Sequence, residues 1–236
     1  FSRWSKAKKM YKSAALYFIY CALVAIPVVV AWSTGIAPND PWSELGSAFG
    51  IVALSMFILQ FLSSGRFESR SLHFSIDQVM ALHKWTARLL LTIVIAHPLL
   101  FVSETLLQNP SIAISKFATI LMSSNYRTGL LSLLLITFTV MISVFRKGFK
   151  IRYEIWRFVH LFFGYLAFIF AIHHTLTVGT YSEDYRLKSI WILGATIIGV
   201  CLIFLYGIRP ILILKRMYEV VASERLSRDI IKVVLR

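Results

Sequence analysis

The chain has 236 residues, of which 58% are hydrophobic and only 15% are charged. Soluble globular domains usually carry about a quarter of charged residues, so this composition argues against a soluble protein. The formal net charge is +14, but the basic residues are spread over separate loops rather than gathered in one stripe, which argues against a nucleic-acid partner. The composition predicts an integral membrane protein in contact with lipid.

Six apolar stretches are each long enough to cross a hydrocarbon core of ~30 Å as a helix, which takes about 20 residues. Because lipid offers the backbone no hydrogen-bonding partners, each stretch should be helical. The sequence therefore predicts an all-α membrane protein, with a six-transmembrane-helix bundle forming one domain over residues 1–216. The predicted spans lie at 14–31, 44–63, 79–103, 127–145, 154–178 and 188–208.

Basic residues are concentrated in alternate connections between these spans. Lys and Arg are frequent before the first span, between the second and third, around the start of the fifth and after the sixth. The other connections, near 32–43, 104–126 and 179–187, hold few of them. Since cytoplasmic loops carry the excess of Lys and Arg, we expect six passes with both termini in the cytoplasm, in the plasma membrane.

The last twenty residues, 217–236, break the apolar pattern. The stretch "YEVVASERLSRDIIKVVLR" has two β-branched runs separated by a polar segment, which predicts two strands joined by a turn. An amphipathic cytoplasmic helix is the alternative. Two strands alone are only marginally stable in water, so we expect them to begin a larger soluble domain and the chain to be a fragment of a longer protein.

Five of the six histidines fall in the third and fifth predicted spans. His83 and His97 are fourteen residues apart, and His160 is followed by His173 and His174 after thirteen and fourteen residues. At about 100° and ~1.5 Å per residue, fourteen residues return a helix to within ~40° of the same face and separate two rings by ~21 Å. Each of the two spans therefore presents an imidazole near each side of the membrane.

The third and fifth spans cross the membrane in the same direction, so their histidines can face each other in pairs at two depths. Imidazole is a common axial ligand of haem iron, and helix bundles build cofactor sites from side chains on facing helices. The pattern predicts two stacked haems, the inner one held by His83 and His160 and the outer one by His97 with either His173 or His174. No C-x-x-C-H attachment motif occurs, so both should be b-type. Zinc and copper also bind histidine, but no carboxylate or cysteine lies at a matching depth.

The choice between the two adjacent histidines stays open at this point. An ideal helix favours His174, because a step of thirteen residues turns the side chain by ~140° away from the face of His160. A bend or a π-turn would bring His173 round instead.

Two arginines near the inner histidines are further candidates for cofactor contacts. Arg88 and Arg157 could bind a haem propionate or another cofactor group such as a flavin phosphate. Arg88 could equally extend along its span to the cytoplasmic surface, and Arg157 could serve only as a positive-inside residue. We assign no catalytic side chain.

The histidine pairs, together with "YEIWRFVH" at Tyr153–His160, resemble the ferric reductase-like transmembrane domain shared by ferric reductases and NADPH oxidases. The stretches "SIDQVMALHKWTARL", "IAHPLL" and "RTGLLSLLL" are similar to the bacterial members, and the resemblance covers residues 45–216. In that family the second pair is thirteen residues apart, which implies His173 as the outer ligand, with His174 as the alternative.

The resemblance also implies a function, that of an oxidoreductase of the NADPH oxidase or ferric reductase type. Electrons from NAD(P)H would pass through FAD in the protein's own cytosolic domain, then through two haems, to oxygen, giving superoxide, or to a ferric chelate outside. Residues 217–236 would be the first strands of the FAD-binding barrel, and this chain would be only the haem-bearing part.

Two other functions fit the sequence less well. One is a b561-like membrane cytochrome subunit that exchanges electrons with quinol or a separate dehydrogenase. The other is a non-redox transporter or structural bundle in which the histidines are incidental.

Overall fold

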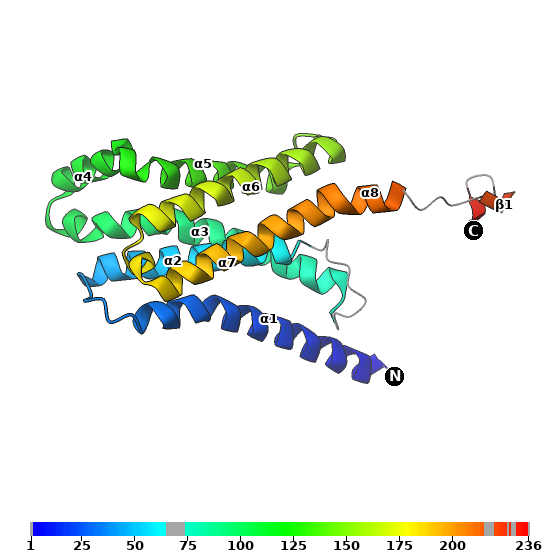
Figure 1. Ribbon diagram of the computed structural model, residues 1–236, viewed down its shortest axis with the longest axis horizontal. Helices are drawn as coiled ribbons and strands as arrows, with labels where there is room; N and C mark the ends of the chain where they lie inside the picture. Colours follow the sequence, from blue (N-terminus) through cyan, green and yellow to red (C-terminus); the bar gives the residue numbers. More distant parts are fainter. Residues whose placement is uncertain (1, 65–73, 215–219, 226, 228–229, 236) are drawn as a thin grey trace. The chain divides into compact units, whose positions relative to one another are not determined.

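The computed structural model describes all residues except 1, 65–73, 215–219, 226, 228–229 and 236, and the described chain is mainly helical (Figure 1). In chain order its elements are α1 (Ser2–Trp32), α2 (Pro41–Leu62), α3 (Ile76–Gln108), α4 (Pro110–Met122), η1 (Ser124–Tyr126), α5 (Arg127–Phe145), α6 (Tyr153–Val178), η2 (Thr180–Glu183), α7 (Tyr185–Leu202), the π-helical segment η3 (Ile203–Ile208), α8 (Arg209–Leu214), β1 (Val220–Arg225) and β2 (Ile231–Leu235).

Among the described residues, six helical segments are long and apolar enough to cross a membrane, in agreement with the number of predicted spans. They cover Ser13–Trp32, Pro41–Leu62, Ile76–Gln108, Ser124–Phe145, Tyr153–Val178 and Tyr185–Leu214. Each includes or overlaps one of the apolar stretches identified in the sequence. The protein is an integral membrane protein.

The chain divides into two units, Phe1–Ala195 and Thr196–Arg236. In the first unit the hairpins α2–α3 and α5–α6 lie side by side, with α3 against α5 and α2 against α6 (Figure 1). α1 packs on α2 and α3. Leu54, Leu82, Leu90, Ala167 and Phe168 are among the buried side chains that hold these helices together.

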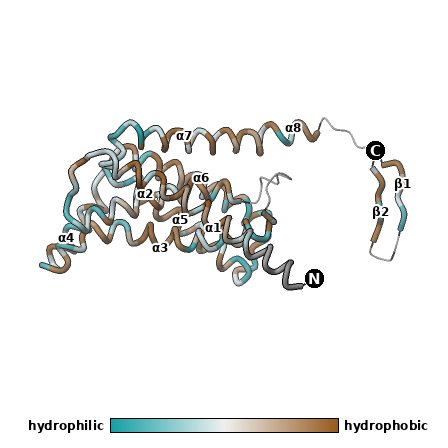
Figure 2. Tube along the Cα trace, turned by 90° about the horizontal axis from the view of Figure 1, so that it is seen from below, coloured by the Kyte–Doolittle hydropathy of each residue, from teal (hydrophilic) through white to brown (hydrophobic). Residues whose placement is uncertain are grey.

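The outer faces of the same helices carry large exposed apolar side chains, such as Phe18, Trp85 and Phe158. Hydrophobic residues follow the helices of this unit along most of their length (Figure 2). A soluble monomer rarely exposes so much apolar surface, whereas lipid covers it without cost. The two kinds of surface together fit a helix bundle that is packed inside and lipid-facing outside.

Local signals in the sequence determine where several helices begin. Asp40 caps α2 by accepting hydrogen bonds from the backbone N–H groups of Trp42 and Ser43, both at 3.0 Å. Ser75 caps α3 in a reciprocal arrangement with Gln78.

The connection near 104–126 differs from the expected loop. α3 continues to Gln108, and α4 follows after a single residue. Asn109 caps α4 through its side chain and Pro110 occupies its first turn, a combination that favours a helix start and that span-by-span hydropathy overlooks.

Polar contacts join the connections that follow α1 and α6. The Tyr181 hydroxyl donates a hydrogen bond to Glu44 at 2.5 Å, and this bond raises the pKa of Tyr181 to about 12. Arg186 pairs with Asp184 at 3.0 Å and also donates to the backbone oxygen of Ser33 at 3.0 Å. Hydrogen bonds from Arg186 lower the pKa of the Asp184 carboxyl.

In the second unit, β1 and β2 form an antiparallel pair with an irregularity between Val220 and Ala222. The two strands predicted for the end of the chain are therefore present. Their place in a larger barrel stays a prediction, and the predicted domain boundary at 216/217 lies outside the described residues.

Candidate functional site

The histidines of α3 and α6 meet first at the ends nearest His83 and His160. The centroids of these two half-buried rings are 6.4 Å apart, and their planes are inclined by 60°. Two imidazole nitrogens that bind one metal ion from opposite sides, each at about 2 Å, place their ring centroids roughly 6 Å apart. The observed separation fits a shared metal between the two rings.

The His160 ring is held by side chains on α5 and α6. Its Nδ1 lies 2.9 Å from Ser143 Oγ, which is also 2.7 Å from the backbone oxygen of Thr139. The Trp156 indole donates to Ser143 Oγ at 3.2 Å, and its ring lies 5.3 Å from the His160 ring. Arg146 lies over Trp156, with 5.0 Å from its guanidinium carbon to the ring centroid.

The His83 ring has a different polar environment, supplied by α2 and α3. Ser63 Oγ lies 3.4 Å from Nδ1, and the buried amide group of Gln60 reaches within 2.8 Å of the same nitrogen. The Gln60 amide also lies 2.7 Å from Thr86 Oγ1. Nδ1 of both rings therefore has polar side-chain neighbours, which fix the orientation of each imidazole.

At the opposite end of α3, His97 is fixed by α2. Its Nδ1 lies 2.8 Å from the backbone oxygen of Gly46, and because a carbonyl can only accept, Nδ1 must carry the proton. A Cβ atom at Gly50 would come within 2.9 Å of His97 Cε1, so only glycine leaves the ring this position. The neutral ring then presents the Nε2 lone pair, as a metal ligand must.

The His174 side chain is half-buried and faces the interior of the bundle, where it lies against Gly129 on α5. A Cβ atom at Gly129 would come within 2.8 Å of its ring, so the ring packs directly on α5. Its Nδ1 is buried and has no hydrogen-bond partner among the described residues. A buried imidazole nitrogen without a protein partner fits a site that is completed by a bound group.

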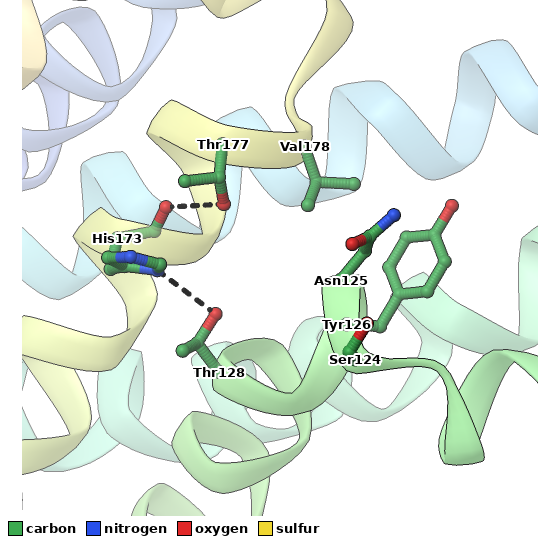
Figure 3. Close-up of a pocket in the computed structure, with 7 residues that line it drawn as sticks. All are labelled: Ser124, Asn125, Tyr126, Thr128, His173, Thr177 and Val178. Atoms are coloured by element: carbon green, nitrogen blue, oxygen red, sulfur yellow. Dashed lines mark hydrogen bonds between the residues drawn. The ribbon is translucent and has the colours of Figure 1, made fainter.

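His173 has the opposite orientation, because its neighbour in the helix occupies the inner face. Its side chain is exposed, and Nδ1 lies 3.4 Å from Thr128 Oγ1. It lines a pocket of about 430 Å³ beside η1 and the end of α6 (Figure 3). The remaining lining residues are Ser124, Asn125, Tyr126, Thr128, Thr177 and Val178.

This pocket adjoins the His97–His174 end of the bundle. The Tyr126 ring, which lines the pocket, is 6.3 Å from the ring of His174. All of the lining side chains except Val178 can form hydrogen bonds. A polar molecule held there would be one side chain away from His174.

The side chains of the two predicted arginines are both exposed. Arg88 is exposed and lies over the Trp85 ring at 5.3 Å, and Arg157 is exposed. Their contacts with a propionate or a flavin phosphate stay predictions. Arg146, which the sequence assigns only to the basic cytoplasmic flank, is the arginine that reaches the His160 site through Trp156.

The residues present fit two haem groups. Each end of the α3–α6 pair offers two imidazoles, the Nδ1 atoms of His97 and His160 have local partners, and glycines make room beside His97 and His174. In the described part of the chain, no three His, Cys, Asp or Glu side chains gather as a metal site. The ligand assignments, including the choice between His173 and His174, stay predictions.

The comparisons with known proteins identify the family of this chain. The chain matches the model of the family described as "Ferric reductase like transmembrane component" over residues 49–172, more than half of its length. The match includes His83, His97 and His160 and ends one residue before His173. A search of curated proteins finds no match. Six apolar helices and this match together show that the chain belongs to the ferric reductase-like transmembrane family, a family of membrane oxidoreductases that transfer electrons across the bilayer.

Proposed function

We propose that this domain carries single electrons from a cytosolic flavin to an acceptor outside the cell through two b-type haems. The observation that carries the proposal is the pairing of imidazoles at both ends of the same two helices. The ring centroids of His83 and His160 are 6.4 Å apart. At the other end, α2 fixes His97, and the buried Nδ1 of His174 has no hydrogen-bond partner among the described residues. The fourteen-residue spacing within each helix separates the two sites by ~21 Å along the bundle.

The protein's own part is to ligate the haems, to orient the ligating imidazoles and to shield the space between the helices from water. Each haem, when bound, supplies a reversible one-electron iron couple. The carbonyl of Gly46 holds His97 in the tautomer that offers Nε2, and apolar side chains such as Leu90 and Phe168 keep water out of the space between the helices.

The outer ligand on α6 is the point at which structure and resemblance differ. The resemblance implies His173, but His173 is exposed and lies against Thr128. His174 is half-buried and packed on Gly129, and its buried Nδ1 has no hydrogen-bond partner among the described residues. We therefore infer that His174 is the outer ligand. The helix continues through this region as a regular α-helix, so the fourteen-residue step keeps His174 on the face of His160.

The acceptor would approach at the pocket beside His173. With both termini cytoplasmic, as the distribution of basic residues favours, this end of the bundle faces outward in the plasma membrane. The pocket offers neutral hydrogen-bonding groups, which suit a ferric chelate with oxygen ligands as well as oxygen itself.

FAD and NAD(P)H would bind in a cytosolic domain that begins with β1 and β2. Separate assays of superoxide and of ferrous iron, on the full-length enzyme with NADPH or NADH, distinguish the acceptors and the donors.

Haem quantitation of single histidine variants tests the proposal. We expect two b haems per chain in the wild type, and loss of one or both in His83→Ala, His160→Ala, His97→Ala and His174→Ala. His173→Ala is the matched control, because it changes the adjacent residue and should keep both haems. Loss of a haem from His173→Ala together with retention in His174→Ala would reverse our choice of outer ligand. Wild-type protein without a Soret band would refute the electron-transfer function.

A further inference from the structure

We propose that Ser143 is a positioning residue that holds His160 in the Nδ1-protonated tautomer and thereby sets the electron-donating strength of this ligand. The inference rests on the proposed function, because it concerns the ligand of the inner haem. It assigns a role to a residue of α5 that neither ligates nor touches the iron.

The argument follows from the hydrogen atoms available around Ser143 Oγ. A hydroxyl carries one proton and can accept two hydrogen bonds. Ser143 Oγ and the backbone oxygen of Thr139 lie 2.7 Å apart, and since a carbonyl cannot donate, the serine proton must lie between them. The Trp156 indole can only donate, and it does so to Ser143 Oγ at 3.2 Å.

One place on Ser143 Oγ remains, and His160 Nδ1 occupies it at 2.9 Å. Because the serine has no second proton, the hydrogen of this bond must belong to the imidazole. A neutral imidazole with its proton on Nδ1 carries its lone pair on Nε2. Ser143 therefore selects the tautomer that can bind iron, because the backbone oxygen of Thr139 takes the only proton that the hydroxyl could donate.

The same bond affects how strongly His160 donates electrons. An acceptor on the distal N–H of a ligating histidine orients the ring and raises its basicity. At His97 the acceptor is the carbonyl of Gly46, whereas at His160 it is a neutral hydroxyl already engaged with Trp156. Loss of the Ser143 hydroxyl should make His160 a weaker donor, which favours ferrous over ferric iron and raises the midpoint potential of the inner haem.

The chain supplies a matched control on the same helix. Ser132 is also on α5, and its hydroxyl donates to the backbone oxygen of Ala167 on α6 at 2.9 Å, with no contact to a histidine. Ser132→Ala thus removes one α5–α6 hydrogen bond without changing a ligand. Any general loosening of the helix pair should appear in both variants, but a change in ligand strength only in Ser143→Ala.

The experiment is a spectroelectrochemical redox titration, with haem quantitation, of purified wild type, Ser143→Ala, Ser143→Thr and Ser132→Ala. We expect Ser143→Ala to raise the inner-haem midpoint potential and to weaken haem binding at that site by about 10- to 100-fold. Ser143→Thr, which keeps a hydroxyl, should restore both values toward wild type, and Ser132→Ala should leave the potential unchanged.

Trp156→Phe supplies a second reading if Ser143→Ala loses the inner haem altogether. It frees Ser143 Oγ to accept from His160 alone, so the inner-haem potential should not rise. An unchanged potential in Ser143→Ala that retains two haems, an equal shift in Ser132→Ala, or a rise in Trp156→Phe would overturn the role of Ser143. Absence of haem from the wild type would instead refute the proposed function.

Discussion

At the scale of single residues, two glycines make room for the imidazoles at the His97–His174 end of the site. Gly50 and Gly129 face the rings of His97 and His174, where a Cβ atom would lie 2.9 and 2.8 Å from the nearest ring atom. Real Cβ contacts are almost never so short. These glycines therefore act by leaving space for imidazoles, in addition to the close helix approach expected of small residues in membranes.

Gly129→Ala should displace the His174 ring and reduce occupancy of the outer haem, while the inner haem stays bound. The added methyl group would lie 2.8 Å from the nearest ring atom, so the ring must move from the position it holds in the wild type. Haem content and the reduced-minus-oxidised spectrum of the purified variant measure the effect. Thr128→Ala, one residue away and directed toward His173, should keep both haems. Full outer-haem occupancy in Gly129→Ala would show that His174 does not ligate from this position.

At the scale of elements, the connections at the His97 end are joined by side chains rather than by apolar packing. Glu44 at the start of α2 accepts from Tyr181 on η2, and Arg186 at the start of α7 reaches the end of α1 through Ser33. These bonds connect three of the spans at one end. Since Tyr181 and Asp184 lie outside the spans, they are open to changes in pH.

The Tyr181–Glu44 bond should make stability fall at high pH. The folded pKa of Tyr181, about 12, exceeds its unfolded value of about 10, so the contribution of this bond is complete below about pH 10 and is lost as the pH rises toward 12. Thermal unfolding in detergent across this range should show a decline that Tyr181→Phe reduces. Tyr185→Phe, which changes a largely exposed neighbouring tyrosine, should keep the wild-type profile. Equal declines in all three proteins would exclude this bond as the cause.

At the scale of the whole molecule, the arrangement of six spans determines which compartment each end of the bundle faces. An even number of crossings returns the chain to the side on which it began, and basic residues such as Arg146 and Lys147 predict that this side is cytoplasmic. Orientation is a property of the entire set of spans. The orientation of the chain in the membrane decides whether the pocket beside His173 is open to acceptors outside the cell.

Single cysteines should report this orientation in intact cells. With Cys21 and Cys201 replaced, Asn39→Cys and Asn125→Cys should react with a membrane-impermeant maleimide added outside. Lys147→Cys, in the connection between α5 and α6, should react only after permeabilisation. The reverse pattern would place the pocket in the cytoplasm and contradict our assignment of the acceptor side.

The fold was largely predictable from the sequence, and the site only in part. Six apolar stretches require six helices because lipid leaves the backbone no other partners, and the spacing of His83 and His97 on one helix face follows from the helical repeat alone. The two β-branched runs likewise predicted β1 and β2. α4 escaped notice because it is too short to span and its start signal, Asn109–Pro110, was read as part of a loop.

What only the tertiary structure decided is which groups meet across helices. The sequence by itself established that α3 and α6 each carry two levels of imidazoles, because that depends on residue spacing within one chain segment. It could not show that Ser143 supports His160 or that Gly46 orients His97. The helical repeat favoured His174, but only the structure shows that His174 packs on Gly129 while His173 is exposed. These contacts depend on the rotation and depth of neighbouring helices, which packing sets and no periodicity within a single helix encodes.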